Sequence, residues 1–170
     1  KFKNKINYVI LRYFNVVGVE KKMRCGYEIN KNQGLFNNLS KSDVNNKNFY
    51  VFGKGLDTKD GTAIRDFIYI TDLSEVHYKF AKIIKKQKIK IIINCGYGKG
   101  YSVLEVINQF NIYLNKKINF FFKERRKGDI EYSVANTKKL KKFHNFKNKK
   151  NRLSLMIETS LKWYKKNLKT

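Results

Sequence analysis

Proline is absent from this 170-residue sequence, and cysteine occurs only twice, at Cys25 and Cys95. The two cysteines lie seventy positions apart, and neither belongs to a CxxC motif or a Cys/His cluster. This spacing excludes a disulfide framework and a cysteine-ligated metal site, so we expect no metal and a reducing, cytoplasmic environment. No apolar run reaches the roughly 20 residues that cross a bilayer, and no signal-peptide pattern is present. We therefore expect no membrane partner.

Acidic residues are also scarce, because thirteen Asp and Glu stand against 38 Lys and Arg, giving a formal net charge of +25. Such an excess is typical of proteins that bind nucleic acids or anionic membranes. However, 93 residues belong to only five types, Lys, Asn, Ile, Phe and Tyr, whereas alanine occurs only three times. Because these five side chains are chemically unrelated, the bias indicates drift in coding composition. Only six basic residues are arginines, the side chain that reads bases with a bidentate fork. We expect no nucleic-acid ligand and keep a basic nucleic-acid-binding module as the alternative of another class.

One segment departs from this bias. Residues 51–75, VFGKGLDTKDGTAIRDFIYITDLSE, hold five of the thirteen acids and only three basic residues. A segment that keeps its acids in so basic a chain indicates a requirement for particular side chains rather than for solubility.

Strand and helix patterns alternate along the chain. Short runs rich in β-branched and aromatic residues predict strands, and apolar residues at helical spacing predict helices. The predicted strands are 7–14, 48–53, 63–70, 90–95 and 118–122, the predicted helices begin at Asp72, Ser102 and about Leu153, and residues 15–47 are expected to be loop with one short helix. Asp72 with Glu75, and Ser102 with Glu105, have the spacing of capping boxes. The alternation predicts an α/β fold.

The glycine-rich fingerprints of nucleotide binding are absent from the sequence. No GxxGxxG or GxGxxG follows a predicted strand, so the chain has no dinucleotide-binding turn of its own. The segment GYGKG, residues 96–100, precedes a predicted helix but lacks the closing Lys-Ser/Thr of a P-loop. We interpret it as a turn that needs positive φ.

Four collinear motifs resemble those of the UDP-glucose 4-epimerases, in the extended short-chain dehydrogenase/reductase (SDR) superfamily. FGKGLDTKDGTAIRDFIYITDLSEVH resembles the family pattern FGxDYDTxDGTxxRDYIHVxDLAxxH, and LRYFNVVG resembles LRYFNxxG. NCGYGKGYSVLEVI and RRKGDIEYSVAN resemble NLGxGxGxSVxEVI and RRxGDxxxxxAxxxK. The closing LSLMIETSLKWYKK also resembles the end of the family sequences. The match covers nearly the whole chain.

The resemblance implies the carboxy-terminal part of an extended SDR fold. Residues 1–170 would form a single UDP-sugar-binding portion, with a residual Rossmann strand near 7–14 and a small mixed α/β domain. The amino-terminal NAD-binding half, which carries GxxGxxG and the catalytic YxxxK, is expected to lie outside this sequence. Tyr78 and Lys82 have the YxxxK spacing, but they follow the Arg65 motif and so stand in the wrong place in the family order.

Two arginines are the strongest candidates for binding a diphosphate. Arg65 and Arg126 both lie inside the motifs, and an arginine fork grips phosphate in two-pronged fashion. We expect Asp66 to orient Arg65. Arg125 is expected to make a local contact instead, because neighbouring residues of an extended segment point to opposite sides. By resemblance, Phe52 lies against the uracil and Asp129 takes a ribose hydroxyl.

The resemblance assigns four further positions. Asn15 matches an amide that reaches the substrate, and Phe14 matches a residue that touches the nicotinamide end of NAD. Asn38 matches a substrate-binding amide in one register, whereas the gap-free register puts Gly34 there. Ser133 matches the residue that gates the sugar pocket, where a bulky Tyr restricts the family to glucose and galactose.

The function implied is that of a UDP-glucose/UDP-galactose 4-epimerase with tightly bound NAD, acting through a transient 4-keto sugar. No catalytic residue is expected in this chain, and this chain by itself is expected to be inactive. The small Ser133 suggests tolerance of N-acetylated sugars, so the alternatives within the enzyme class are a UDP-N-acetylglucosamine 4-epimerase or another sugar-nucleotide epimerase or dehydratase. The full-length enzyme is expected to be a homodimer.

Overall fold

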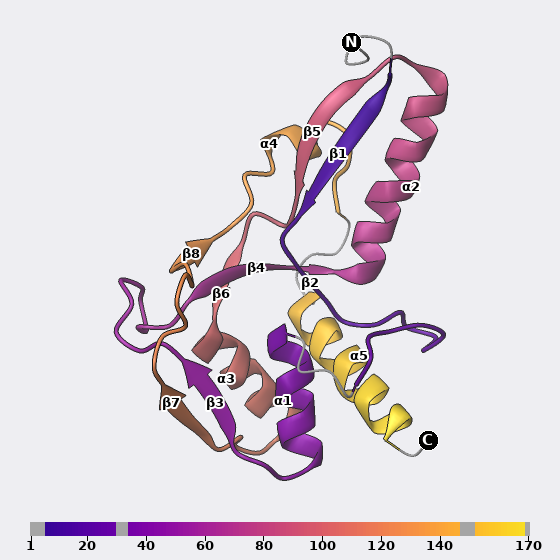
Figure 1. Cartoon of the computed structure of the whole chain (residues 1–170). Coiled ribbons are helices and arrows are strands. Elements are labelled where there is room, and N and C mark those ends of the chain that lie inside the picture. Colours follow the sequence, from indigo (N-terminus) through magenta and orange to yellow (C-terminus); the bar gives the residue numbers. More distant parts are fainter. Residues whose placement is uncertain (1–5, 30–33, 147–151, 169–170) are drawn as a thin grey trace.

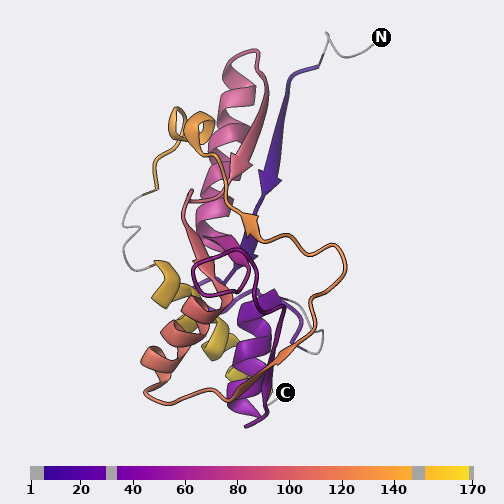
Figure 2. The same ribbon diagram turned by 90° about the vertical axis from the view of Figure 1, so that its left-hand side faces the viewer.

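A computed structural model describes residues 6–29, 34–146 and 152–168. Its elements form an upper layer built on a two-stranded parallel sheet, a lower layer of helices around a second strand pair, and a central strand that joins them (Figures 1 and 2). The α/β fold expected from the sequence is confirmed.

The upper layer consists of β1 (Tyr8–Tyr13), β5 (Lys90–Cys95) and α2 (Ile70–Lys86). The strands are parallel and in register from Tyr8 opposite Lys90 to Tyr13 opposite Cys95. Helix α2 runs along the strands and buries its apolar residues in a core with Ile93 (Figure 1). The register partners Ile10 and Ile92 are 48% and 41% exposed, although parallel sheets are usually covered on both faces.

The lower layer pairs β3 (Phe49–Phe52) with β7 (Phe120–Lys123) in parallel and packs three helices beside them. These helices are α1 (Gly34–Val44), α3 (Val103–Leu114) and α5 (Arg152–Asn167). Phe36 of α1 meets Phe67 and Phe110 edge to face, with ring centroids 5.2 and 5.6 Å apart. This aromatic cluster fixes the position of α1, which forms one wall of the site described below.

Strand β4 (Ile64–Tyr69) joins the two layers. Its second half pairs in parallel with β2 (Asn15–Val17). Its first half pairs antiparallel with β6 (Gly100–Ser102) and parallel with β8 (Tyr132–Ser133). The short helix α4 (Lys138–Lys141) follows β8 and packs against β5. The three short strands β2, β6 and β8 were not predicted from the sequence, because each has only two or three residues, too few to show the alternating pattern of a strand.

The two predicted capping boxes have different outcomes. Ser102 accepts a hydrogen bond from the Glu105 backbone N–H at 3.0 Å, and the Glu105 carboxylate accepts one from the Ser102 N–H at 2.8 Å, so this box is confirmed. The prediction of a capping box at Asp72 is wrong, because α2 begins at Ile70 and no side chain caps its first turn. Asp72 is instead buried, where it accepts a hydrogen bond from the Tyr97 hydroxyl and forms an ion pair with Arg152 at 2.9 Å.

Two acids of residues 51–75, Asp66 and the buried Asp72 described above, hold the fold together. The fully buried Asp66 carboxylate accepts hydrogen bonds from the backbone N–H groups of Tyr97, Gly98 and Ala135, at 3.0, 2.8 and 3.2 Å. Burial raises the pKa of Asp66, although these three bonds oppose the shift. Gly98 has a φ of +70°, so the turn predicted at residues 96–100 does contain a residue in the left-handed region. Asp66 therefore fastens this turn and the segment after β8 to the central strand.

Candidate functional site

The largest concentration of predicted site residues surrounds one cavity of about 520 Å³ between α1, β3 and β4. Six of the seven predicted substrate-binding residues line it, namely Asn15, Asn38, Phe52, Arg65, Arg126 and Asp129. They come from positions more than a hundred residues apart, because β4 brings β2 and β8 together and β3 brings the chain after β7 to the same place. Whether these residues bind substrate stays a prediction, but the fold does gather them around one cavity.

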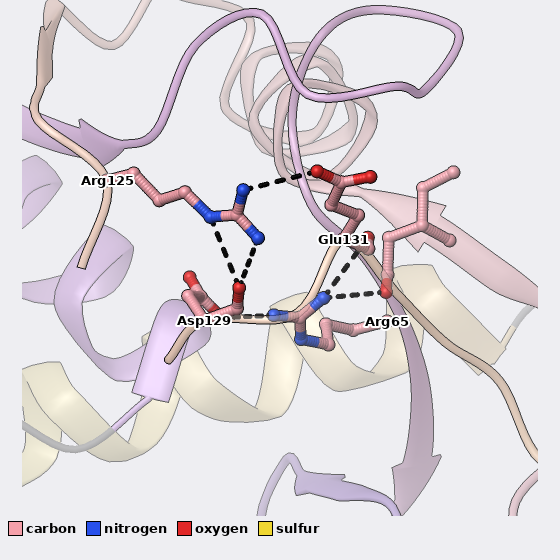
Figure 3. Close-up of polar contacts among 5 residues, drawn as sticks. Arg65, Arg125, Asp129 and Glu131 are labelled. Carbon is pink, nitrogen blue, oxygen red and sulfur yellow. Dashed lines mark hydrogen bonds and ion pairs between the residues drawn. The ribbon is translucent and has the colours of Figure 1, made fainter. Parts of the chain in front are cut away.

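Arg65 is oriented by Asp129 and not by Asp66. The Arg65 guanidinium forms an ion pair with the Asp129 carboxylate and donates a hydrogen bond to the Ile64 carbonyl at 3.0 Å (Figure 3). The prediction for Asp66 is wrong because adjacent residues of a strand point to opposite faces, so Asp66 turns into the core while Arg65 faces the cavity.

Arg125 approaches the same aspartate from the other side. Its Nε and Nη2 donate to the Asp129 backbone carbonyl at 3.2 and 2.6 Å, and its Nη1 lies 3.2 Å from the Glu131 carboxylate (Figure 3). This local role was expected for Arg125. The side chain clamps the loop that carries Asp129 and does not line the cavity.

Arg126 points the other way from its neighbour and reaches the cavity. Its Cζ lies 3.8 Å from the centroid of the Phe52 ring, a close cation–π contact. Its side chain makes no hydrogen bond or ion pair with any other residue that the structure describes. The turn that carries it is closed by a hydrogen bond from the Asp129 N–H to the Arg126 carbonyl, at 3.1 Å, with Gly128 at a φ of +79°.

The cavity is strongly basic. Four cations line it, Lys41, Lys47, Arg65 and Arg126, and among the described residues Asp129 is the one carboxylate in the lining, where it pairs with Arg65. A cavity with this imbalance attracts an anionic ligand. The sequence analysis missed Lys41 and Lys47, because nothing in a chain with 32 lysines distinguishes these two from the rest.

Asn38 is one of the polar residues of α1 that line the cavity, together with Lys41 and Ser42. Its Oδ1 atom is buried and has no hydrogen-bond partner among the described residues, which leaves it free to accept one from a ligand. Gly34, the candidate of the other register, lines the same cavity at the start of α1. Asn15 is exposed at the start of β2.

Two predicted residues lie outside the cavity lining. Ser133 is on β8 directly opposite Arg65, and paired residues of adjacent strands share a face, so Ser133 stands next to the cavity wall. Phe14 lies between β1 and β2, half-buried, and its N–H donates to the Cys95 carbonyl at 3.2 Å. Phe14 therefore marks the carboxyl end of the β1–β5 pair, the edge at which open α/β sheets bind their ligands.

That Phe14 contacts NAD stays a prediction. The sequence contains no GxxGxxG or GxGxxG turn for the dinucleotide phosphates. Within residues 6–29, 34–146 and 152–168, no three His, Cys, Asp or Glu side chains gather in a way that could hold a metal ion. In the same ranges, no helix is both long enough and apolar enough to span a membrane.

Comparison with known proteins relates the chain to one family. The model of the NAD dependent epimerase/dehydratase family matches residues 2–96. The UDP-glucose 4-epimerase of Bacillus subtilis (strain 168) is 34% identical over 170 residues, which cover 97% of this chain and 49% of that protein.

Solved structures give the same result. A UDP-glucose-4-epimerase from Stenotrophomonas maltophila, with bound NAD and formylated UDP-arabinopyranose, has a TM-score of 0.89 at 28% identity, covering 96% of this chain and 49% of that one. The UDP-glucose 4-epimerase from Bifidobacterium longum, in complex with NAD⁺ and UDP, has a TM-score of 0.80 at 32% identity, covering 95% and 48%. The chain thus spans about half the length of these proteins.

Proposed function

We propose, from the premise that this chain belongs to the NAD dependent epimerase/dehydratase family, that it is the UDP-sugar-binding portion of a UDP-glucose 4-epimerase. The observation that carries the proposal is the cavity, in which two arginines from distant segments stand beside an aromatic ring and a carboxylate. The two crystal structures named above, which resemble the structure of this chain, hold a UDP-sugar or UDP. The interconverted substrates would be UDP-glucose and UDP-galactose.

Each group in the cavity suits one part of a UDP-sugar. Arg126, with Arg65 beside it, offers donors to the diphosphate, which carries two negative charges. Phe52 offers an apolar surface at the uracil, and Asp129 an acceptor for a ribose hydroxyl. Asn15 and Asn38 provide amides for the sugar end. Firm binding of the UDP would leave the sugar free to present either face for reaction, as inversion at C4 requires.

The chemical step would use groups that this sequence does not contain. NAD, when bound, supplies the acceptor for a hydride from C4, and the proton of the 4-hydroxyl requires a base, which the family provides with a Tyr and Lys in YxxxK. In this chain Phe14 would contact the nicotinamide end. We also propose a cytoplasmic location, which the lack of cysteine pairing favours, and a homodimer for the longer protein.

The proposal is tested by titrating the ¹⁵N-labelled chain with UDP, UDP-glucose and a short RNA. We expect shifts for residues lining the cavity with UDP and UDP-glucose, which compete with each other. Binding of RNA that weakens steeply with salt, and that UDP-glucose does not displace, would favour a nucleic-acid module instead.

We expect no epimerase turnover by the 170-residue chain on its own. A coupled assay that follows conversion of UDP-galactose to UDP-glucose in the presence of NAD measures this. Because the sequence has no catalytic YxxxK in the family's position, measurable turnover would show that the assignment of roles to the two portions is incorrect.

The sugar specificity should depend on Ser133. We propose that this small side chain leaves room for an N-acetyl group, which supports UDP-N-acetylglucosamine as a further substrate. In Ser133→Tyr, the affinity for UDP-N-acetylglucosamine is expected to fall about tenfold relative to UDP-glucose, because one misfit in a pocket costs roughly 1–3 kcal/mol. Tyr132→Ser, next to it and 64% exposed, is the matched control. An unchanged ratio in Ser133→Tyr would contradict the prediction.

A further inference from the structure

We propose that Phe52 acts as a positioning residue for Arg126, holding its guanidinium at the cavity by the face of the ring. The inference deepens the proposed function and rests on it only for the identity of the anion, a nucleoside diphosphate. The Arg126 Cζ lies 3.8 Å from the Phe52 ring centroid, within van der Waals contact, and both side chains line the cavity.

The three arginines of this region differ in how their donors are used. Arg65 donates to Asp129 and to the Ile64 carbonyl, and Arg125 donates to the Asp129 carbonyl and to Glu131. Among the residues that the structure describes, the Arg126 guanidinium has one partner, the Phe52 ring, which attracts the cation through its quadrupole and accepts none of its N–H groups in ordinary hydrogen bonds. Its charge is therefore not neutralised by a carboxylate, and its five donors remain available to a phosphate.

The backbone on both sides of this contact is fixed. Phe52 is the register partner of Lys123, and the next residue, Gly53, donates its N–H to the Lys123 carbonyl at 3.0 Å. A Cβ placed on Gly53 would lie 3.7 Å from the Arg125 side chain, so the two segments approach closely just before Arg126. With both chains held, the ring restricts the last rotatable bonds of Arg126, which lowers the entropy lost when an anion binds.

This role differs from stacking on the base and is separable from it. A residue that only stacks on uracil contributes equally to uridine and UDP binding, and nothing to an anion without a base. A residue that positions Arg126 contributes to inorganic pyrophosphate binding as well. Inorganic pyrophosphate is therefore the probe that distinguishes the two roles.

The experiment compares pyrophosphate affinity of the ¹⁵N-labelled chain by NMR titration. Phe52→Leu, which removes the ring, should weaken binding roughly 2–5-fold, the effect of an exposed cation–π contact, and Phe52→Tyr should stay near wild type. Phe122→Leu is the matched control, since it removes a similar contact, between Lys54 and the ring of Phe122 on β7 (5.1 Å), and neither residue lines the cavity. It should leave the affinity unchanged. The double variant Phe52→Leu/Arg126→Gln should bind pyrophosphate no more weakly than Arg126→Gln alone, because Phe52 acts through Arg126.

Two outcomes overturn the proposal: a pyrophosphate affinity that Phe52→Leu leaves unchanged while uridine binding falls, or a Phe52→Tyr variant as weak as Phe52→Leu. A readout without ligand separates this failure from failure of the proposed function. The ring current of Phe52 should displace the side-chain resonances of Arg126 in the free protein, and this displacement should disappear in Phe52→Leu and persist in Phe52→Tyr. If wild type binds neither UDP nor pyrophosphate, the proposed function fails, while the ring-current result still decides whether Phe52 positions Arg126.

Discussion

Replacing Arg126 by glutamine is expected to weaken UDP binding by about 10- to 100-fold, because hydrogen bonds to a charged group contribute roughly 1.5–3 kcal/mol. The side chain is exposed, and its guanidinium makes no polar contact with the described residues, so the fold should not depend on it. The affinity is measured by calorimetry or by NMR titration, with the unfolding midpoint as a check on stability.

The neighbouring arginine provides the matched control. In Arg125→Gln the chain loses the clamp on the Asp129 carbonyl and the contact with Glu131. Asp129 lines the cavity, but Arg125 and Glu131 do not. Its UDP affinity should stay within a few-fold of wild type, since the loss reaches the ligand only through the loop. A larger loss of affinity in Arg125→Gln than in Arg126→Gln would mean that the two arginines exchange roles when UDP binds.

Replacing Asp66 by asparagine is expected to lower the free energy of unfolding by about 2–4 kcal/mol, although the two side chains have nearly the same shape. Both carboxylate oxygens of Asp66 accept backbone N–H groups, Oδ1 from Tyr97 and Oδ2 from Gly98 and Ala135. An asparagine keeps one acceptor and places an NH₂ group against the remaining N–H donors. At least one buried donor is then left unpaired.

Chemical denaturation measures this loss, and Asp57→Asn is the control. Asp57 lies in the same acid-rich segment but is exposed, so its replacement should change the free energy of unfolding by less than about 0.5 kcal/mol. Equal effects of the two substitutions would show that the Asp66 carboxylate does not fasten the 96–100 turn in solution.

Features set by neighbouring residues could be predicted from the sequence. Strand 90–95 coincides with β5, and the Ser102–Glu105 capping box forms as expected, because both depend on residues within one element. The Asp72–Glu75 pair has the same spacing, yet Asp72 pairs with Arg152, eighty positions away. A capping pattern therefore fails where a distant cation and burial stabilise the carboxylate elsewhere.

The sequence by itself determined the α/β alternation, the family and the residue types of the proposed anion site, because periodicity, motifs and side-chain chemistry belong to individual residues and their order. Only the tertiary structure decided which of these residues meet. Alternation along β4 turns Asp66 into the core and Arg65 toward Asp129, and the β3–β7 pairing brings Arg126 onto Phe52. The physical reason is that such contacts depend on strand register and on the direction of each side chain, which follow from the packing of the whole chain.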